Sequence, residues 1–240
     1  MMIQKQIKLA LLQLGLLMLI GSLDVSAQTD AEPVQTQPQT HERVYQVELI
    51  IFARPEVNPQ EHWSTDVKLN YPENLVSLKT ENDPEGFSLL PASERTLNPQ
   101  AATLARSGTY TLLYHQAWRQ PIYARKTNIF ISGGKSLGGH QELEGSIALS
   151  VGQYLKIQTN LWLSQFVAPG TDIAENWPDL PSLPFTDSTS SNKSQDYLIK
   201  RIVKITEARS MRSNEVHYID HPLLGMVIKI IPYEASAKTN

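Results

Sequence analysis

The sequence has no cysteine among its 240 residues. This absence excludes disulfide bridges, thiolate metal sites, a cysteine nucleophile and the attachment of a lipid to an N-terminal cysteine after export. The folded chain must therefore be held together by a hydrophobic core, and a chain of this length can bury a sizeable one.

An excess of charge of one sign is also lacking. The chain carries 21 Lys and Arg against 24 Asp and Glu, for a net charge of -3. Proteins that bind nucleic acid normally present clustered Lys and Arg side chains. We therefore expect no nucleic-acid partner.

Long hydrophobic runs are confined to the start of the chain. Lys5 and Lys8 precede an apolar run over residues 9–20, and small residues lead up to Ala27. This order is typical of a secretory signal peptide. The run is shorter than the roughly 20 residues with which a helix crosses a bilayer. We expect residues 1–27 to be a signal peptide cleaved after Ala27, leaving a mature chain outside the cytoplasm without a membrane span; an uncleaved signal anchor is the alternative.

Two segments offer few apolar residues for burial. Residues 28–42 are polar and contain proline, which predicts a disordered leader. Residues 168–195 hold four prolines and then a Ser/Thr-rich stretch, which predicts a long loop. We expect a single domain over residues 43–233 that contains this loop, followed by a tail over residues 234–240.

Within that domain the apolar residues recur mostly with the two-residue period of strands. Residues 44–52 alternate and then become a continuous β-branched run that ends at Arg54 and Pro55, which predicts a first, central strand. The other predicted strands are residues 110–118, 127–132, 141–151, 154–166, 197–209, 215–219 and 224–231.

One helix is expected between the first two strong strands, beginning at Pro91 or Ser93 and ending near Gly108. A flexible hairpin loop is expected over residues 133–139. The order of elements predicts an α+β fold, a mostly antiparallel sheet with one or two helices.

Enzyme motifs are lacking too. No Gly-x-Ser-x-Gly elbow is present. Residues 132–136 are similar to the end of a phosphate-binding loop, but Ile129 stands where that motif requires glycine, and a strand is predicted where it requires a helix. We expect no cofactor. Glu142 and Glu144 share one face of a predicted strand and could act as an acid and base in glycoside cleavage, although most such pairs are a solvated sheet face.

Histidine spacing raises the question of a metal site. His217 and His221 are four residues apart, so a helix would bring both rings to one face. The β-branched neighbours favour a strand, and Pro222 ends any helix there. Turn or surface histidines are therefore favoured over metal or other ligand contacts, and we predict no metal site.

Aromatic side chains are a better indication of function. Their flat apolar faces and polar edges suit pyranose rings as well as a core or an interface. Trp118 and Trp162 fall on the more polar parity of their strands, so we predict that both are exposed and bind ligand.

Four blocks spread over nearly the whole mature chain carry a family resemblance. They read YQVELIIFAR from Tyr45, YHQAWRQP from Tyr114, LEG from Leu143 with VGQYL from Val151, and SMRSNEVHYIDHP from Ser210 with LGMVIKI from Leu224. As a set, the blocks resemble the CsiV family of periplasmic peptidoglycan-binding proteins from Gram-negative bacteria.

The resemblance implies a non-enzymatic, periplasmic wall-binding protein. It also implies that the protein supports peptidoglycan synthesis together with a bifunctional penicillin-binding synthase and its outer-membrane lipoprotein activator. A protein adaptor of that machinery, which touches glycan only incidentally, is the alternative, and a wall hydrolase using the two glutamates is less favoured.

The resemblance supplies no ligand residues, so the predicted site rests on the residues alone. The densest polar and aromatic cluster is the C-terminal block, whose alternative role is a buried strand pair with an Arg–Asp bond. Besides the two tryptophans, the predicted ligand-binding residues are Arg209, Arg212, His217, Tyr218, Asp220 and His221.

Overall fold

Strand β1 (Val44–Ala53) lies between β11 (Leu224–Tyr233) and β4 (Thr111–Pro121) and pairs antiparallel with both. The structure is a computed structural model that describes residues 43–55, 63–78, 86–173, 175–185 and 198–234. These residues all belong to one unit, His41–Asn240. The predicted signal peptide and leader, the Ser/Thr-rich stretch, and the tail beyond residue 234 lie outside the described residues.

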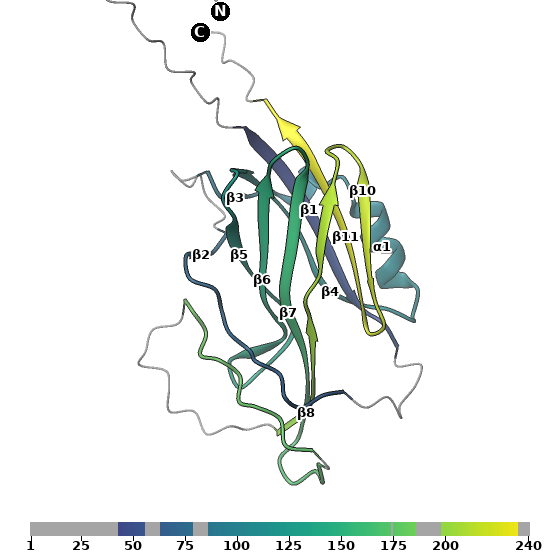
Figure 1. Cartoon of the computed structure of the whole chain (residues 1–240). Helices are drawn as coiled ribbons and strands as arrows, with labels where there is room; N and C mark the ends of the chain where they lie inside the picture. The colour runs from purple at the N-terminus through teal and green to yellow at the C-terminus, as the bar shows by residue number, and fades with distance from the viewer. Residues whose placement is uncertain (1–42, 56–62, 79–85, 174, 186–197, 235–240) are drawn as a thin grey trace, which may run out of the picture. The chain divides into compact units, whose positions relative to one another are not determined.

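Two sheets make up the fold (Figure 1). Sheet A has the strand order β10-β11-β1-β4-β3, and sheet B has the order β2-β5-β6-β7-β8, with β9 also paired to β7. The remaining strands are β2 (Leu75–Val76), β3 (Ser88–Leu89), β5 (Thr127–Leu137), β6 (His140–Val151), β7 (Leu155–Val167), β8 (Leu198–Ile205), β9 (Ala208–Met211) and β10 (Val216–His221).

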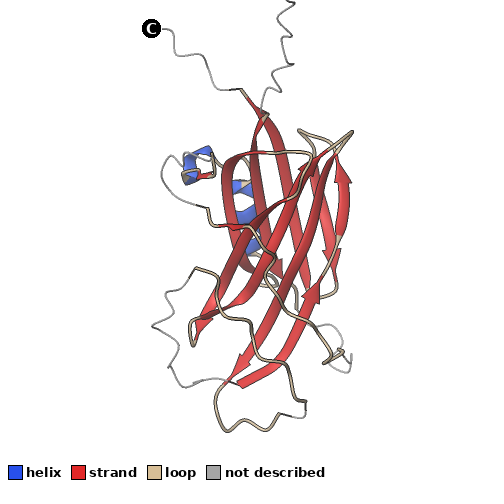
Figure 2. Ribbon diagram, turned by 60° about the vertical axis from the view of Figure 1, so that its left-hand side comes forward, coloured by secondary structure: helices blue, strands red, loops and turns tan. Residues whose placement is uncertain are grey.

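Pairing is antiparallel except between the short β2 and β5. The strands from β5 to β8 follow one another in sequence order, whereas β1 pairs with strands far from it in the chain. In Figure 2, many more of the described residues belong to strands than to helices. The predicted α+β fold with a mostly antiparallel sheet and a single domain is confirmed.

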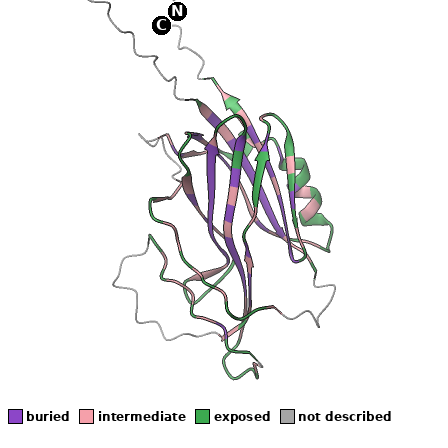
Figure 3. Cartoon of the chain, in the orientation of Figure 1, coloured by how far each residue is buried: buried purple, intermediate pink, exposed green. Residues whose placement is uncertain are grey.

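The core lies between the two sheets. Val47, Leu49 and Ile51 on β1 and Ile147 on β6 belong to one buried cluster. Figure 3 shows buried residues along the middle strands of both sheets, whereas α1 is largely exposed on its outer side. Alternation along each strand therefore directs one face to this core, as the two-residue period predicts.

A second apolar cluster lies on the outer face of sheet A. Ile50 and Phe52, which have the opposite parity to the core residues of β1, pack against Leu97 and Ala101. Ala101 belongs to helix α1 (Asn98–Arg106), and a short 3₁₀ helix (Ala92–Glu94) precedes it. The predicted helix is thus divided into two pieces, with the extended residue Arg95 after the first.

Two further expectations about elements need correction. The loop predicted over residues 133–139 is mostly strand, because β5 continues to Leu137 through a register shift and β6 begins at His140. The strand predicted over residues 197–209 is two strands, β8 and β9, which pair with successive parts of β7. Among the residues that the structure describes, no helix is long and apolar enough to span a bilayer.

Candidate ligand-binding groove

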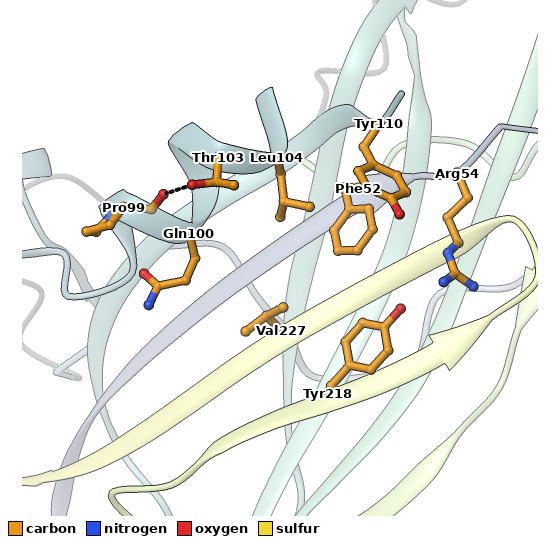
Figure 4. Close-up of a pocket in the computed structure, with 9 residues that line it drawn as sticks. All are labelled: Phe52, Arg54, Pro99, Gln100, Thr103, Leu104, Tyr110, Tyr218 and Val227. Atoms are coloured by element: carbon orange, nitrogen blue, oxygen red, sulfur yellow. Dashed lines mark hydrogen bonds between the residues drawn. The ribbon is translucent and has the colours of Figure 1, made fainter. Parts of the chain in front are cut away.

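A groove of about 500 Å³ lies on the outer face of sheet A, between α1 and the edge strand β10. We call it the α1 groove (Figure 4). It is built on sheet A because β1 ends beside the turn that joins β10 to β11, and the backbone N–H of Arg54 donates to the carbonyl oxygen of Leu223 at 3.0 Å. The lining residues are Phe52, Arg54, Pro99, Gln100, Thr103, Leu104, Tyr110, Tyr218 and Val227.

An ion pair and a phenol form the polar end of the α1 groove. Arg54 Nη1 lies 2.8 Å from Asp220 Oδ1, and the hydroxyl of Tyr218 donates to the same oxygen, also at 2.8 Å. Arg54 Nη1 also donates to the carbonyl oxygen of His221 at 3.3 Å. The side chains of Arg54 and Asp220 remain 30% and 60% exposed, so a ligand in the groove can reach both charges.

The hydroxyl of Tyr218 keeps its proton at neutral pH. Partial burial and then the hydrogen bond to Asp220 raise the pKa of Tyr218, and they outweigh the opposite effect of Arg54. Tyr218 therefore offers a neutral phenol, while its ring stays 49% exposed.

Aromatic rings make the apolar part of the α1 groove. Phe52 and Tyr110 meet edge to face, with 5.1 Å between their ring centroids. Figure 4 shows the hydroxyl ends of Tyr110 and Tyr218 turned toward Arg54, with Leu104 and Val227 beside the ring of Phe52. The arrangement combines flat apolar faces with donors and acceptors at one end, which suits a sugar ring.

Helix α1 is held in place by a buried carboxylate. The N-cap residue Leu97 supplies no side-chain cap. Instead, Glu48 on β1 accepts hydrogen bonds from the backbone N–H of Thr96 at 2.6 Å and of Leu97 at 2.9 Å. The free N–H groups at the start of a helix favour a nearby negative charge. Glu48 therefore holds α1, which forms one wall of the groove, against sheet A.

Residues 11–233 match the family model described as peptidoglycan-binding protein, CsiV. The chain belongs to the CsiV family. The match confirms the resemblance carried by the four sequence blocks. No curated protein and no solved structure matches the chain.

The residues predicted to form one site in this CsiV-family chain do not all lie together in the structure. Tyr218 and Asp220 lie together at the α1 groove. His217 has the other parity on β10, and it lines a different hollow with Arg212, where its Nε2 lies 3.3 Å from the Arg212 carbonyl oxygen.

The side chains of the remaining block residues do not line the groove. The ring centroid of His221 is 5.7 Å from that of Trp63. Arg209 lies on β9 and pairs in register with Ile157 of sheet B. Six residues that are close in sequence therefore face several different parts of the molecule.

The two tryptophans predicted to be exposed are both buried, with relative exposures of 0%. Trp118 faces the main core because the register of β4 against β1 shifts between Ile51 and Phe52, which changes the parity that local alternation predicts. Its indole N–H donates to Gln120 Oε1 at 2.7 Å. Neither tryptophan can therefore stack on a ligand in this structure.

Trp162 does point to the outer face of sheet B, but that face is covered. Trp177 packs on it, together with half-buried residues such as Trp63 and Tyr71, and Ile202 of β8 belongs to the same covered face. One covering segment, residues 63–71, lies far before β7 in the sequence, and the other, which contains Trp177, directly follows β7. The alternation of β7 therefore predicts the face of Trp162 correctly, but the predicted exposure is wrong.

Only one member of the glutamate pair is closed off from a polymer. Glu144 is fully buried, where its carboxylate accepts from the hydroxyl of Tyr71 at 3.3 Å and from the backbone N–H of Gln141 at 2.8 Å. Glu142 accepts from the backbone N–H of Lys135 at 3.0 Å. Both carboxylates thus have partners within the fold. Among the described residues, no group of three or more His, Cys, Asp and Glu side chains could hold a metal ion.

Sequence reasoning missed Arg54, Tyr110 and the groove-facing side of α1. The sequence pattern predicts Arg54 only as the end of the first strand, although Arg54 closes the block that begins at Tyr45. Pairing β1 with the last strand would have placed Arg54 next to the β10–β11 turn and its acidic residue. The signal for Arg54 was therefore present in strand order and not in local sequence.

Proposed function

We propose that this CsiV-family chain is a non-enzymatic peptidoglycan-binding protein of the periplasm and that the α1 groove binds the glycan. The observation that carries the proposal is the juxtaposition of the half-exposed ring of Tyr218 with the Arg54–Asp220 ion pair. The family description supports peptidoglycan as the ligand.

Each part of the α1 groove has a role in this proposal. The rings of Tyr110 and Tyr218 offer apolar faces on which a pyranose ring packs. Arg54 donates to sugar hydroxyls or to a carboxylate, and Asp220 accepts from hydroxyls. Since Asp220 already holds Arg54 and Tyr218, these groups are oriented before a ligand arrives, which lowers the entropy lost on binding.

Sedimentation with insoluble sacculi tests the proposal. We expect the mature protein to pellet with sacculi at physiological salt, and Tyr218→Ala and Arg54→Ala to weaken the binding about tenfold, corresponding to the loss of one charged or aromatic contact of about 1.4 kcal/mol. Tyr154→Ala is the matched control, because Tyr154 is 43% exposed and lies outside the α1 groove. Wild-type protein that stays in the supernatant contradicts the proposal.

We further propose that binding serves wall synthesis, in association with a bifunctional penicillin-binding synthase and its outer-membrane lipoprotein activator. The CsiV family supports this role only through its link to peptidoglycan. A pull-down of the synthase before and after complete digestion of the glycan by a muramidase separates two cases. An association lost on digestion supports binding through the wall, and one that survives supports the alternative of a protein adaptor.

Periplasmic location belongs to the same proposal, and its support is the charged, apolar and small-residue order of residues 1–27. Fractionation followed by N-terminal sequencing tests it, with Gln28 expected as the first residue. A hydrolase acting through Glu142 and Glu144 is disfavoured by the burial of Glu144. Release of soluble fragments from labelled sacculi by the purified protein would support that alternative instead.

A further inference from the structure

A second hollow, of about 410 Å³, lies on the outer face of sheet B. It begins where the irregular segment that covers Trp162 ends, at Asn70 and Pro72. We call it the amide groove, after its side chains Asn128, Gln158 and Asn160.

Strand register explains both the hollow and its walls. Ala148 on β6 pairs with Asn128 on β5 and with Gln158 on β7, and Ala208 on β9 is the next residue in this row. Neighbouring strands lie about 4.8 Å apart, so amide and methyl side chains alternate across the sheet at that spacing. The short alanine side chains form troughs between the longer amides.

Two of the amides are oriented by the covering segment. Asn128 Nδ2 donates to the carbonyl oxygen of Glu73 at 3.1 Å, and Asn160 Nδ2 donates to that of Asn70 at 2.9 Å. Each of these two amide groups donates one hydrogen bond to the cover, and its oxygen remains as an acceptor. Gln158 makes no side-chain hydrogen bond to the described residues, so it offers both a donor and an acceptor. A ligand that itself carries peptide groups matches this pattern, because a side-chain amide pairs with a backbone amide through one donor and one acceptor.

The charges around the amide groove favour an anion. Lys126 and Lys204 line it against the single acid Glu207. Lys204 donates to the carbonyl oxygen of Lys68, which places its ammonium group at the cover. Lysine ammonium groups attract carboxylates as point charges, whereas the hydroxyl groups of a sugar gain little from them.

We propose that the amide groove is a second binding site, which takes a short acidic peptide. This inference rests on the proposed function, within which the peptide class is the carboxylate-bearing stem of peptidoglycan. The α1 groove, with its aromatic rings, takes the glycan. The amide groove has no aromatic residue among the described residues that line it, and its amides and lysines fit the peptide.

The two grooves lie on opposite outer faces of the pair of sheets, with the main core between them. Packed sheets are about 10 Å apart, and side chains extend outward from both. One sugar–peptide unit is therefore not expected to occupy both grooves at once. The protein then holds a glycan with one face and a peptide from another strand with the other face.

The test uses sacculi cut by an amidase that separates peptides from glycan, which gives two soluble probes, the free stem peptide and peptide-free glycan chains. Each is titrated into ¹⁵N-labelled mature protein. We expect the free peptide to shift the amide signals of residues 126–128, 146–148 and 158–160. Glycan chains should shift those of Arg54 and Tyr218 instead.

Substitutions in the amide groove test whether its side chains bind the peptide. Lys126→Glu and Gln158→Ala should each weaken binding of the free peptide about tenfold. This is the effect expected from losing one interaction with a carboxylate, for Lys126, or the amide hydrogen bonding, for Gln158. Tyr218→Ala should leave it unchanged. Lys200→Glu is the matched charge control, since Lys200 is exposed on β8 and lines neither groove. Retained thermal transitions establish that each variant is folded.

The outcomes separate this inference from the proposed function. Wild-type protein that pellets with sacculi, but shows no shift of the amide-groove signals with free peptide, overturns the inference and leaves glycan binding intact. The inference is also overturned if glycan chains shift the amide-groove signals, or if Lys126→Glu and Gln158→Ala bind the peptide as well as wild type. Failure of the wild type to pellet with sacculi overturns the proposed function itself.

Discussion

Glu48 Oε1 accepts a hydrogen bond from the backbone N–H of Leu97, 2.9 Å away, although the two residues are 49 positions apart in the sequence. The other carboxylate oxygen accepts from Thr96, and His115 Nε2 lies 2.9 Å from Oε1. One buried side chain thus joins the central strand, the strand beside it and the start of α1.

Replacing Glu48 by Gln is expected to lower the free energy of unfolding by about 1–3 kcal/mol, because a charged acceptor of several hydrogen bonds becomes neutral. Urea denaturation measures the change. Glu94→Gln is the control, since Glu94 pairs with Arg119 in a partly exposed ion pair, for which about 0–1 kcal/mol is expected. Equal effects of the two substitutions would contradict the anchoring role of Glu48.

The stabilisation by Glu48 should depend on pH in a defined direction. Burial opposes ionisation, but the hydrogen bonds from His115, Leu97 and Thr96 outweigh it and lower the pKa of Glu48 below its ordinary value of 4.5. A lowered folded-state pKa gives stability that is present above 4.5 and is lost as the pH falls through the folded value. The difference in unfolding free energy between wild type and Glu48→Gln should therefore be constant near neutral pH and shrink below pH 4.5. A difference that grows on acidification would show that folding raises the pKa of Glu48 and does not lower it.

Gly225 gives a test of the groove floor. A Cβ atom at this position would lie 2.2 Å from the ring of Phe52, its cross-strand partner. Gly225→Ala should displace that ring, lower the free energy of unfolding by about 1–3 kcal/mol and weaken binding of glycan chains. Gly152→Ala is the control, because no atom lies within 4 Å of the added methyl group. Unchanged glycan affinity in folded Gly225→Ala would show that the position of Phe52 does not matter for binding.

Trp118 should affect stability and not binding. Trp118→Phe leaves Gln120 Oε1 without the indole donor in a buried site, which costs about 1–3 kcal/mol in addition to the lost packing. Pelleting with sacculi should match wild type at a temperature where the variant is fully folded. Reduced binding by folded Trp118→Phe, with normal binding by Tyr218→Ala, would show that Trp118 contributes to ligand binding.

Local sequence was sufficient for most of the long strands and their pairing type, because strand alternation and turn residues act over a few positions. It located β1 as a central strand and predicted a mostly antiparallel sheet. It failed where a segment outside the strand decides exposure. Trp162 has the parity of an exposed side chain and is buried only because residues near Trp63 and Trp177 cross over it.

The candidate site shows the same limit. Tyr218 and Asp220 could be chosen from the C-terminal block because polar and aromatic residues are dense there. The alternative role predicted for that block was an Arg–Asp bond within it, whereas the structure pairs Asp220 with Arg54 from outside the block. Strand register brings Arg54 to Asp220 across more than 160 positions, and no local pattern reports a contact at that separation.

Val44 and Tyr233 face each other at one end of the β1–β11 pair, and Ala53 and Leu224 face each other at the other end. A ten-residue strand spans roughly 30 Å, and Arg54 lies beyond its far end. A fluorescent protein or a biosensor surface coupled beyond either Val44 or Tyr233 is thus attached away from Arg54 and Tyr218. Fusions at both positions should therefore give the same glycan affinity, and immobilised protein should present the α1 groove toward the solution.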